Sequence, residues 1–419
     1  MHHGLKKSAK VIFLLVFMGV FIAGSNNIVS TRSQLLRSYT RKYEFDFVEW
    51  TSNSLIAKII DASLHLPDYF PQESKAKITS DYVAYSNKIN ELKNEIQQQY
   101  GNPANNESDK TNLTLNSELE KIENKFILIK PSVERILSEQ IQEVLAQDNI
   151  SKLRFTLPPL MFDISELPEN LIISPRDKIE QEYSISLVSG LKIDEIDDLE
   201  TIIDSKLDVS SLVVPIGGLG TYPTMIEASS SLPWVINTII HEWTHNWLVF
   251  RPLGWNYGKS NELRTMNETT ASIIGNEIEV MVLKDYYPIY YDTLVNSSNK
   301  TSPTSDQNNS MNVFDYHTEM RITRVEVDSL LAMGKIDEAE AYMNYRRNIF
   351  WQNGYQIRKL NQAFFAFYGA YADIPVGAAG DDPVGPAVRK LREQSGSISE
   401  FLFSISRMSS FSDLLQSLK

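Results

Sequence analysis

Residues 234–250 read WVINTIIHEWTHNWLVF and contain an H-E-x-x-H pattern at His241, Glu242 and His245. Side chains four residues apart lie on one face of a helix, so both imidazoles can reach a single metal ion. Glu242 lies beside them, where it can hold a water molecule. The stretch therefore predicts a helix that carries a zinc site.

The expected boundaries of this helix follow from its flanks. Ser231 can cap the helix, Pro233 suits its first turn, and Pro252 ends it. Apolar residues occupy more than one side of the stretch, which indicates a buried helix. Two histidines and a glutamate are costly to bury unless an ion or other partners compensate for the lost water.

A second helical run, ELRTMNETTASIIGNEIEVMVL at residues 262–283, offers the third ligand. Glu268 is the preferred candidate because small residues follow it on the same face and allow close approach of the two helices. A rival interpretation is also open. Thr265 and Glu268 fit a capping box, which would leave Glu262 as the ligand. Glu262 lies so near the expected helix start that Glu268 is favoured.

Such a site has a specific chemistry. One Zn²⁺ held by His241, His245 and Glu268 would lower the pKa of a bound water and polarise a carbonyl group. Glu242 would then accept the proton of the zinc-bound water as general base and return it to the leaving amine. The predicted reaction is hydrolysis of a bond in a peptide or protein substrate.

The oxyanion of such a reaction needs a cationic or phenolic partner. Beyond the two proposed ligands, His317 is the candidate for a second catalytic residue, and a solvated histidine at a helix end is the alternative. Tyr316, Tyr355 and Arg321 are further candidates. An arginine such as Arg321 is more often a surface or ion-pairing residue.

Composition narrows the choice of partners and ligands. The 419 residues carry a formal net charge of -13 and no clustered stripe of Lys and Arg, so we expect no nucleic-acid partner. The chain has no cysteine. This excludes disulfides, cysteine-ligated zinc and a thiol nucleophile, and any metal site must use histidines and carboxylates.

The N-terminal residues predict an export signal. Residues 11–24, VIFLLVFMGVFIAG, form an apolar run preceded by Lys6, Lys7 and Lys10. Residues 1–30 are either a signal that is cleaved, for example after Ser25, or a retained single-pass membrane anchor. We expect an anchor at the cell membrane with an extracytoplasmic body, or a secreted or periplasmic protein if the signal is cleaved.

The remaining chain predicts a predominantly helical α+β fold. Residues 31–150 form a helical N-terminal region, in which 73–100 and 115–148 pair as a hairpin and Pro131 starts or kinks the second helix. Residues 151–295 form the catalytic core, whose short apolar runs are strands of a small mixed sheet. Within it, the glycine-rich IGGLGT at 216–221 is a turn or edge strand open to another chain.

Residues 296–312 are polar and predict a flexible loop. Residues 313–419 then form a helical C-terminal region. Its expected helices span 316–333, 336–350, 354–371, 386–395 and 397–418, with a loop at 373–385.

The motifs HEWTH and NETTA resemble those of the gluzincin zinc metallopeptidases. This resemblance implies a zincin-like fold with a mixed sheet whose edge strand receives substrate, two metal helices and a helical C-terminal half. The edge strand would lie in SLVVPIGGLGTYPTMI, residues 211–226. Within that clan, the chain is similar to bacterial membrane-anchored aminopeptidase-like proteins, which share an IIHEWTHNW-type metal helix and an RKLNQAFFAFYGAY-type helix.

The chain departs from the gluzincin pattern in three places. The interval from His245 to Glu268 is longer than usual, and Ser272 stands where thermolysin-like members carry an aspartate beside a metal histidine. The G-x-M-E-N motif of one aminopeptidase family is absent. A peptidase is therefore favoured over the narrower aminopeptidase. The alternatives are a non-catalytic, membrane-anchored helical envelope protein with a structural zinc site, and a zinc hydrolase acting on a non-peptide amide.

Overall fold

The computed structural model describes residues 31–64, 69–100, 108–148, 150, 157–300, 314–369 and 383–419. The chain divides into two compact units, Met1–Lys42 and Tyr43–Lys419. Helix α2 (Thr31–Thr40) belongs to the first unit. The predicted signal or anchor at residues 1–30 lies outside the described residues. Within those that are described, no helix has both the length and the apolar character that crossing a bilayer requires.

The described chain is a predominantly helical α+β protein, as predicted, and it has fifteen helices. It has two small three-stranded sheets where one mixed sheet was expected. The mixed sheet has the order β1 (Phe162–Ile164), β6 (Thr224–Ile226), β5 (Gly218–Leu219), with β1 parallel and β5 antiparallel to β6.

The antiparallel sheet has the order β3 (Tyr183–Leu187), β2 (Glu169–Pro175), β4 (Val209–Val214). Helix α6 (Ile193–Leu207) connects β3 to β4. The sheets are separate because β4 is followed by Pro215, which has no N–H to continue a ladder. The chain then leaves for the mixed sheet.

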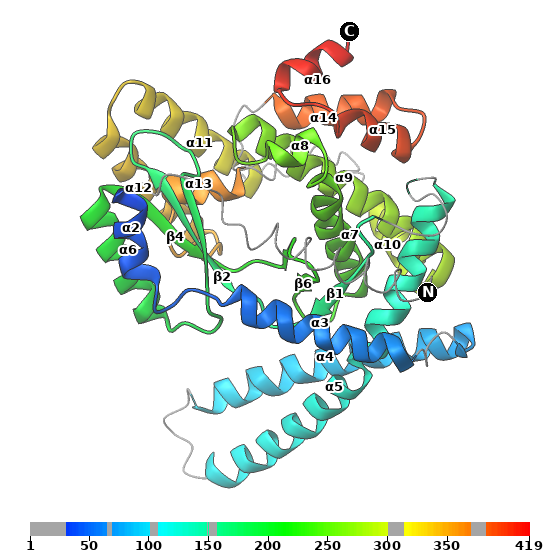
Figure 1. Cartoon of the computed structure of the whole chain (residues 1–419). Coiled ribbons are helices and arrows are strands. Elements are labelled where there is room, and N and C mark those ends of the chain that lie inside the picture. Colours follow the sequence, from blue (N-terminus) through cyan, green and yellow to red (C-terminus); the bar gives the residue numbers. More distant parts are fainter. Residues whose placement is uncertain are drawn as a thin grey trace, which may run out of the picture. The chain divides into compact units, whose positions relative to one another are not determined.

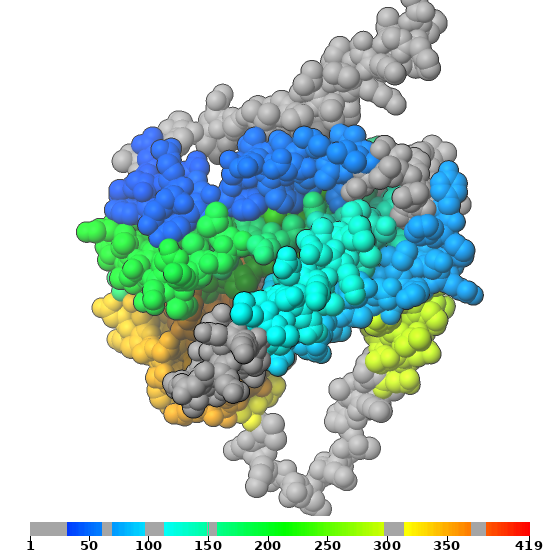
Figure 2. All heavy atoms as spheres, turned by 90° about the horizontal axis from the view of Figure 1, so that it is seen from below, coloured from blue at the N-terminus to red at the C-terminus, as the bar shows by residue number. Residues whose placement is uncertain are grey.

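The predicted N-terminal hairpin is present as α4 (Gln72–Tyr100) and α5 (Ser108–Gln147), which lie side by side after α3 (Phe47–Leu64) (Figure 1). These helices cover much of the face shown in Figure 2. Pro131 does not start the second helix, since α5 begins at Ser108 and continues through the proline. The C-terminal half of α5 is joined to β1, because Ile164 N donates to Glu134 Oε1 (2.7 Å) and Lys130 donates to Asp163 (2.5 Å).

The two predicted metal helices are α7 (Leu232–Leu248) and α9 (Asn261–Tyr286), and the short α8 (Pro252–Trp255) follows α7. Ser231 caps α7 by accepting from Trp234 N, which confirms the expected start. The helices pack closely at Gly275 of α9, where a Cβ atom would come within 3.3 Å of the Asn237 carbonyl oxygen of α7. The small residues after Glu268 therefore serve helix contact, as predicted.

The C-terminal region is helical, but three of the predicted spans are wrong. Helices α11 (Tyr316–Ala332), α12 (Ile336–Gln352) and α14 (Val384–Gln394) match the expectation closely. Residues 296–300 are helical, within α10 (Pro288–Lys300), whereas the rest of the predicted flexible loop to 312 lies outside the described residues.

The other two errors arise at helix ends. The helix expected at 354–371 is only α13 (Gln362–Tyr368), because Gly354 has a φ of +88° after α12 and Asn361 caps α13 by accepting from Phe364 N (2.9 Å). The helix expected at 397–418 is two helices, α15 (Ile398–Ile405) and α16 (Phe411–Ser417). A capping box between Ser410 and Asp413 starts the second.

The core consists of two hydrophobic clusters. The larger contains residues of α7 and α9, of the C-terminal half of α5 and of helices α14–α16. The smaller contains α11–α13, of which α13 packs on β2 and β4.

Candidate metal centre

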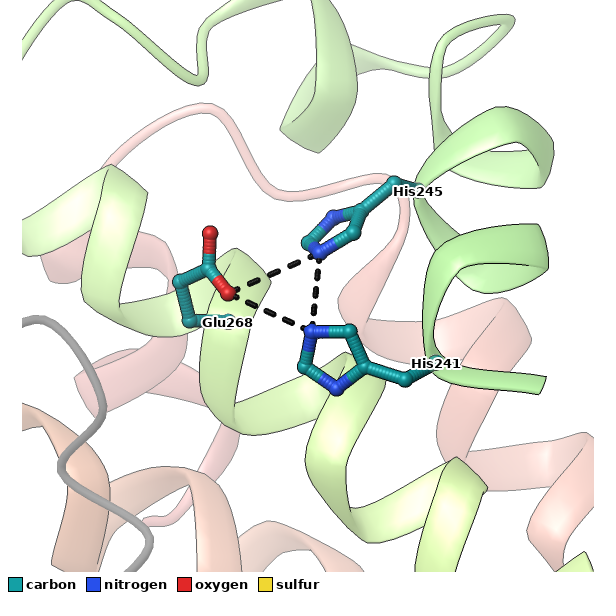
Figure 3. A group of neighbouring side chains, drawn as sticks. All are labelled: His241, His245 and Glu268. Carbon is teal, nitrogen blue, oxygen red and sulfur yellow. Dashed lines mark hydrogen bonds and ion pairs between the residues drawn. The ribbon is translucent and has the colours of Figure 1, made fainter. Parts of the chain in front are cut away.

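His241 and His245 of α7 point toward Glu268 of α9 (Figure 3). The two Nε2 atoms lie 3.1 Å apart, and Glu268 Oε2 lies 3.4 Å from His241 Nε2 and 3.5 Å from His245 Nε2. All three ligand atoms lie within 4.8 Å of one another. This group could hold a metal ion, and it contains the three residues predicted as ligands.

The rival ligand Glu262 is not part of the group. Helix α9 begins at Asn261 with Ser260 as its N-cap, so Glu268 lies two turns inside the helix. A capping role for Glu268 is therefore wrong. Glu262 is exposed in the first turn.

Two polar neighbours orient the ligands. Asn267 Oδ1 lies 2.7 Å from Nδ1 of His245, so the ring donates through Nδ1 and leaves the Nε2 lone pair facing Glu268. The Tyr257 hydroxyl donates to Glu268 Oε1 at 2.5 Å. Its other carboxylate oxygen, Oε2, is buried without a hydrogen-bond donor. A buried acceptor of this kind, aimed at two imidazole lone pairs, fits a divalent cation.

The pKa shifts show how the group behaves without metal. Burial alone would lower the pKa of His245, but the charge of Glu268 outweighs it and raises that pKa to about 9. Burial likewise opposes ionisation of Glu268, yet the two imidazoles hold the pKa of Glu268 well below its ordinary value. A proton shared with the imidazoles thus balances the carboxylate, and a bound cation has to displace it.

Glu242 occupies a different position from the ligands. It is half-buried on α7, and burial raises the pKa of its carboxyl above the ordinary value. Gly218 of strand β5 lies next to the Glu242 side chain. A Cβ atom at Gly218 would come within 2.7 Å of Glu242 Cγ and Oε1, so only glycine lets the backbone approach this closely. The glycine-rich stretch contains an edge strand among the described residues, as predicted, and its openness to another chain stays a prediction.

Two cavities meet at Glu242. The larger, about 770 Å³, extends from His241 toward the end of β4 and helices α11 and α13. The smaller, about 410 Å³, extends past His245 and Glu268 toward Tyr257 and Arg264. Ile216, Gly218, Glu242 and Phe367 line both. The carboxylate of Glu242 is therefore accessible from both sides of the metal group.

His317 and Tyr316 line the larger cavity together with His241 and Glu242. His317 is exposed at the start of α11, and its ring contacts that of Tyr316 at a centroid distance of 5.4 Å. Tyr355 stacks on Tyr316 but is not among the residues that line either cavity. Arg321 is exposed and also lies outside both linings.

Three residues of the site were not predicted from the sequence. Tyr257, Arg264 and Asn267 surround Glu268 and His245, but none belongs to a spacing that identifies a ligand partner. The asparagine before the glutamate is the one that could have been found, because it accompanies the third ligand in the NETTA motif.

Comparisons of the chain with protein-family models, with curated proteins and with solved structures gave no match.

Proposed function

We propose that the protein is a zinc-dependent peptidase that hydrolyses peptide bonds outside the cytoplasmic membrane. The observation that carries the proposal is the position of Glu242, an unligated carboxylate beside a His-His-Glu group and at the wall shared by two cavities. Three protein ligands with room for a fourth are typical of catalytic zinc sites, whereas structural sites are closed by four.

His241, His245 and Glu268 would hold the zinc ion, which would supply Lewis acidity to activate a water and polarise a carbonyl. Glu242 accepts the proton of the attacking water on a carboxylate oxygen and passes it to the leaving nitrogen. Asn267 and Tyr257 hold their ligands in place throughout.

Strand β5 provides a place for the substrate backbone. Among the described residues it pairs only with β6, so its other edge is available for hydrogen bonds to an extended peptide. Gly218 of this strand lies against Glu242. This arrangement supports a peptide substrate over a non-peptide amide, which would not need a strand edge.

The extracytoplasmic location rests on the sequence of residues 1–30. The apolar run at 11–24, with lysines before it, supports export with retention at the membrane.

The test uses the full chain beside Glu242→Gln, which removes the general base and none of the three ligands. We expect about one zinc ion per chain in both proteins, and cleavage of a mixed peptide library by the wild type alone. Equal residual cleavage by both would contradict the mechanism. Tightly bound zinc without cleavage by either would identify a structural site, as in a non-catalytic envelope protein.

A further inference from the structure

Arg264 is a buried cation one turn before Glu268 on α9. Only 6% of its surface is exposed. Its Nη1 donates to the carbonyl oxygen of Ala366 (3.0 Å), and its buried Nε has no hydrogen-bond partner. Among the described residues no carboxylate forms an ion pair with it. A guanidinium is costly to bury without a counter-ion, so the position calls for an anion.

The guanidinium faces the reaction site. Arg264 lines the smaller cavity together with His245 and Glu268. The Tyr257 hydroxyl, which donates to Glu268, is also in contact with Arg264. Ala366 uses only one of the five N–H donors that an arginine carries. One further donor contacts the Tyr257 hydroxyl and Nε is buried, so a ligand in this cavity can accept only from the other guanidinium N–H groups.

Charge distinguishes the two ends of a peptide here. The only acidic side chains among the described residues that line the two cavities are Glu242 and Glu268, and both belong to the metal centre. Neither cavity therefore offers a further carboxylate to bind a peptide amino terminus. The larger cavity also contains Arg358 and Lys359, but both are paired with the buried Glu200. Of the arginines and lysines in the two linings, Arg264 alone has no carboxylate partner within the described chain.

We propose that Arg264 binds the α-carboxylate of a peptide substrate, so that the enzyme removes short fragments from peptide carboxyl termini. The proposal rests on the peptidase function above. The carboxyl-terminal side of the substrate occupies the smaller cavity, and the amino-terminal side extends along β5 into the larger one. A volume of about 410 Å³ lies near the small end of the range for ligand pockets, which suits a fragment of few residues.

The first test compares N-acetylated peptides that differ only in a C-terminal carboxylate or carboxamide. We expect the full-length wild type to cleave the acid with a kcat/KM at least about tenfold higher, as expected for one charge-assisted hydrogen bond. Arg264→Gln should abolish the preference, so that the acid and the amide are cleaved with equal kcat/KM. Arg264→Lys should retain part of the preference.

A matched control is Arg392→Gln. Arg392 of α14 pairs with Glu277 of α9 and lines neither cavity, so this variant loses an equal charge but should keep the full preference. Equal cleavage of acid and amide by the wild type would overturn the proposal. An equal fall for both substrates in Arg264→Gln would do the same.

Binding provides a readout that does not require turnover. Fluorescently labelled acid and amide peptides are titrated into full-length Glu242→Gln, with and without Arg264→Gln. We expect the acid to bind about tenfold more tightly only where Arg264 is present. If the wild type cleaves no peptide at all, the peptidase function fails, and the binding comparison alone decides the carboxylate site. Equal affinities for acid and amide would then reject it.

Discussion

Asn267 Oδ1 lies 2.7 Å from Nδ1 of His245, so helix α9 supplies both a ligand and the residue that orients a ligand of α7. The two residues adjacent in sequence, Asn267 and Glu268, thus contact opposite sides of the same imidazole. Asn267 is itself only 2% exposed and donates to the Leu253 carbonyl oxygen. Its amide is therefore held in the orientation that fixes the histidine tautomer.

We expect Asn267→Leu to weaken zinc binding by about 10- to 100-fold, the usual effect of losing a partner of a metal-bound histidine. Asn267→Asp keeps an acceptor and should retain the affinity. Competition with a chromophoric chelator measures both. Asn276→Leu is a control on the same helix, because Asn276 bonds to Asn237 and to none of the ligands. Unchanged affinity in Asn267→Leu would show that the hydrogen bond does not tune the site.

The hydroxyl of Tyr257 is the only hydrogen-bond donor to Glu268 Oε1 among the described residues. Tyr257→Phe leaves that buried oxygen unsatisfied, which should lower the free energy of unfolding by about 1–3 kcal/mol. Urea denaturation of the chelator-treated protein measures the difference. Tyr290→Phe is the control, since its hydroxyl forms no hydrogen bond with the part of the chain that the structure describes. Equal midpoints for wild type and Tyr257→Phe would contradict the assigned role.

Zinc should stabilise the fold by linkage, because the ligand group forms only when α7 and α9 are packed together. At a free zinc concentration about a thousand times Kd, the free energy of unfolding should rise by about 4 kcal/mol. Thermal or urea unfolding with and without chelator measures this gain. Glu268→Gln should abolish it and Glu262→Gln should preserve it. The opposite result would make Glu262 the ligand.

The ligand group and the metal helices could be predicted because each depends on one helix period or one motif. The spacing of His241 and His245 is local, and the third ligand lies in a recognisable run. The cavities could not be predicted in this way. Strand β5, α13 and the turn that contains Tyr257 come from distant parts of the chain, and only tertiary packing brings them to Glu242. No sequence period encodes such contacts.

The fold errors have local physical causes. Apolar periodicity continues across residues 354–361 and 406–410, so the predicted helices continue too. In the structure, new helices begin after Asn361 and Ser410, because the side-chain oxygen of each residue accepts a hydrogen bond from a free N–H group in the first turn of the next helix. The segment before α13 is held by the contact of Arg358 with the buried Glu200, a long-range pair that no window of sequence contains.

Acid should weaken the fold in part through Glu340. Its two carboxylate oxygens each accept a hydrogen bond from Arg176 at 2.8 Å, and this pairing lowers the pKa of Glu340 below its ordinary value. As pH falls through about 4.3, the unfolded chain therefore takes up a proton before the folded chain does. The stability from Glu340 is fully present above that pH and is lost as pH falls through the folded pKa.

Urea unfolding between pH 6 and pH 3 measures this contribution. Glu340→Gln should be less stable than wild type at pH 6, and the difference should narrow toward pH 3. Glu338→Gln is the control, because its carboxylate pairs with Lys335 at the surface and should matter little at either pH. A difference between wild type and Glu340→Gln that stays constant with pH would argue against the ion pair as its source.

His317 is the residue whose role separates binding from catalysis. It lines the larger cavity with Glu242 but lies outside the ligand group, so His317→Ala should keep full zinc content. If its imidazole stabilises the developing oxyanion, kcat should fall by about 10²- to 10³-fold with little change in KM. Steady-state kinetics and metal analysis of the same preparations measure both effects. A higher KM with unchanged kcat would make His317 a substrate-binding residue and leave the Tyr316 hydroxyl as the next candidate, because it lines the same cavity.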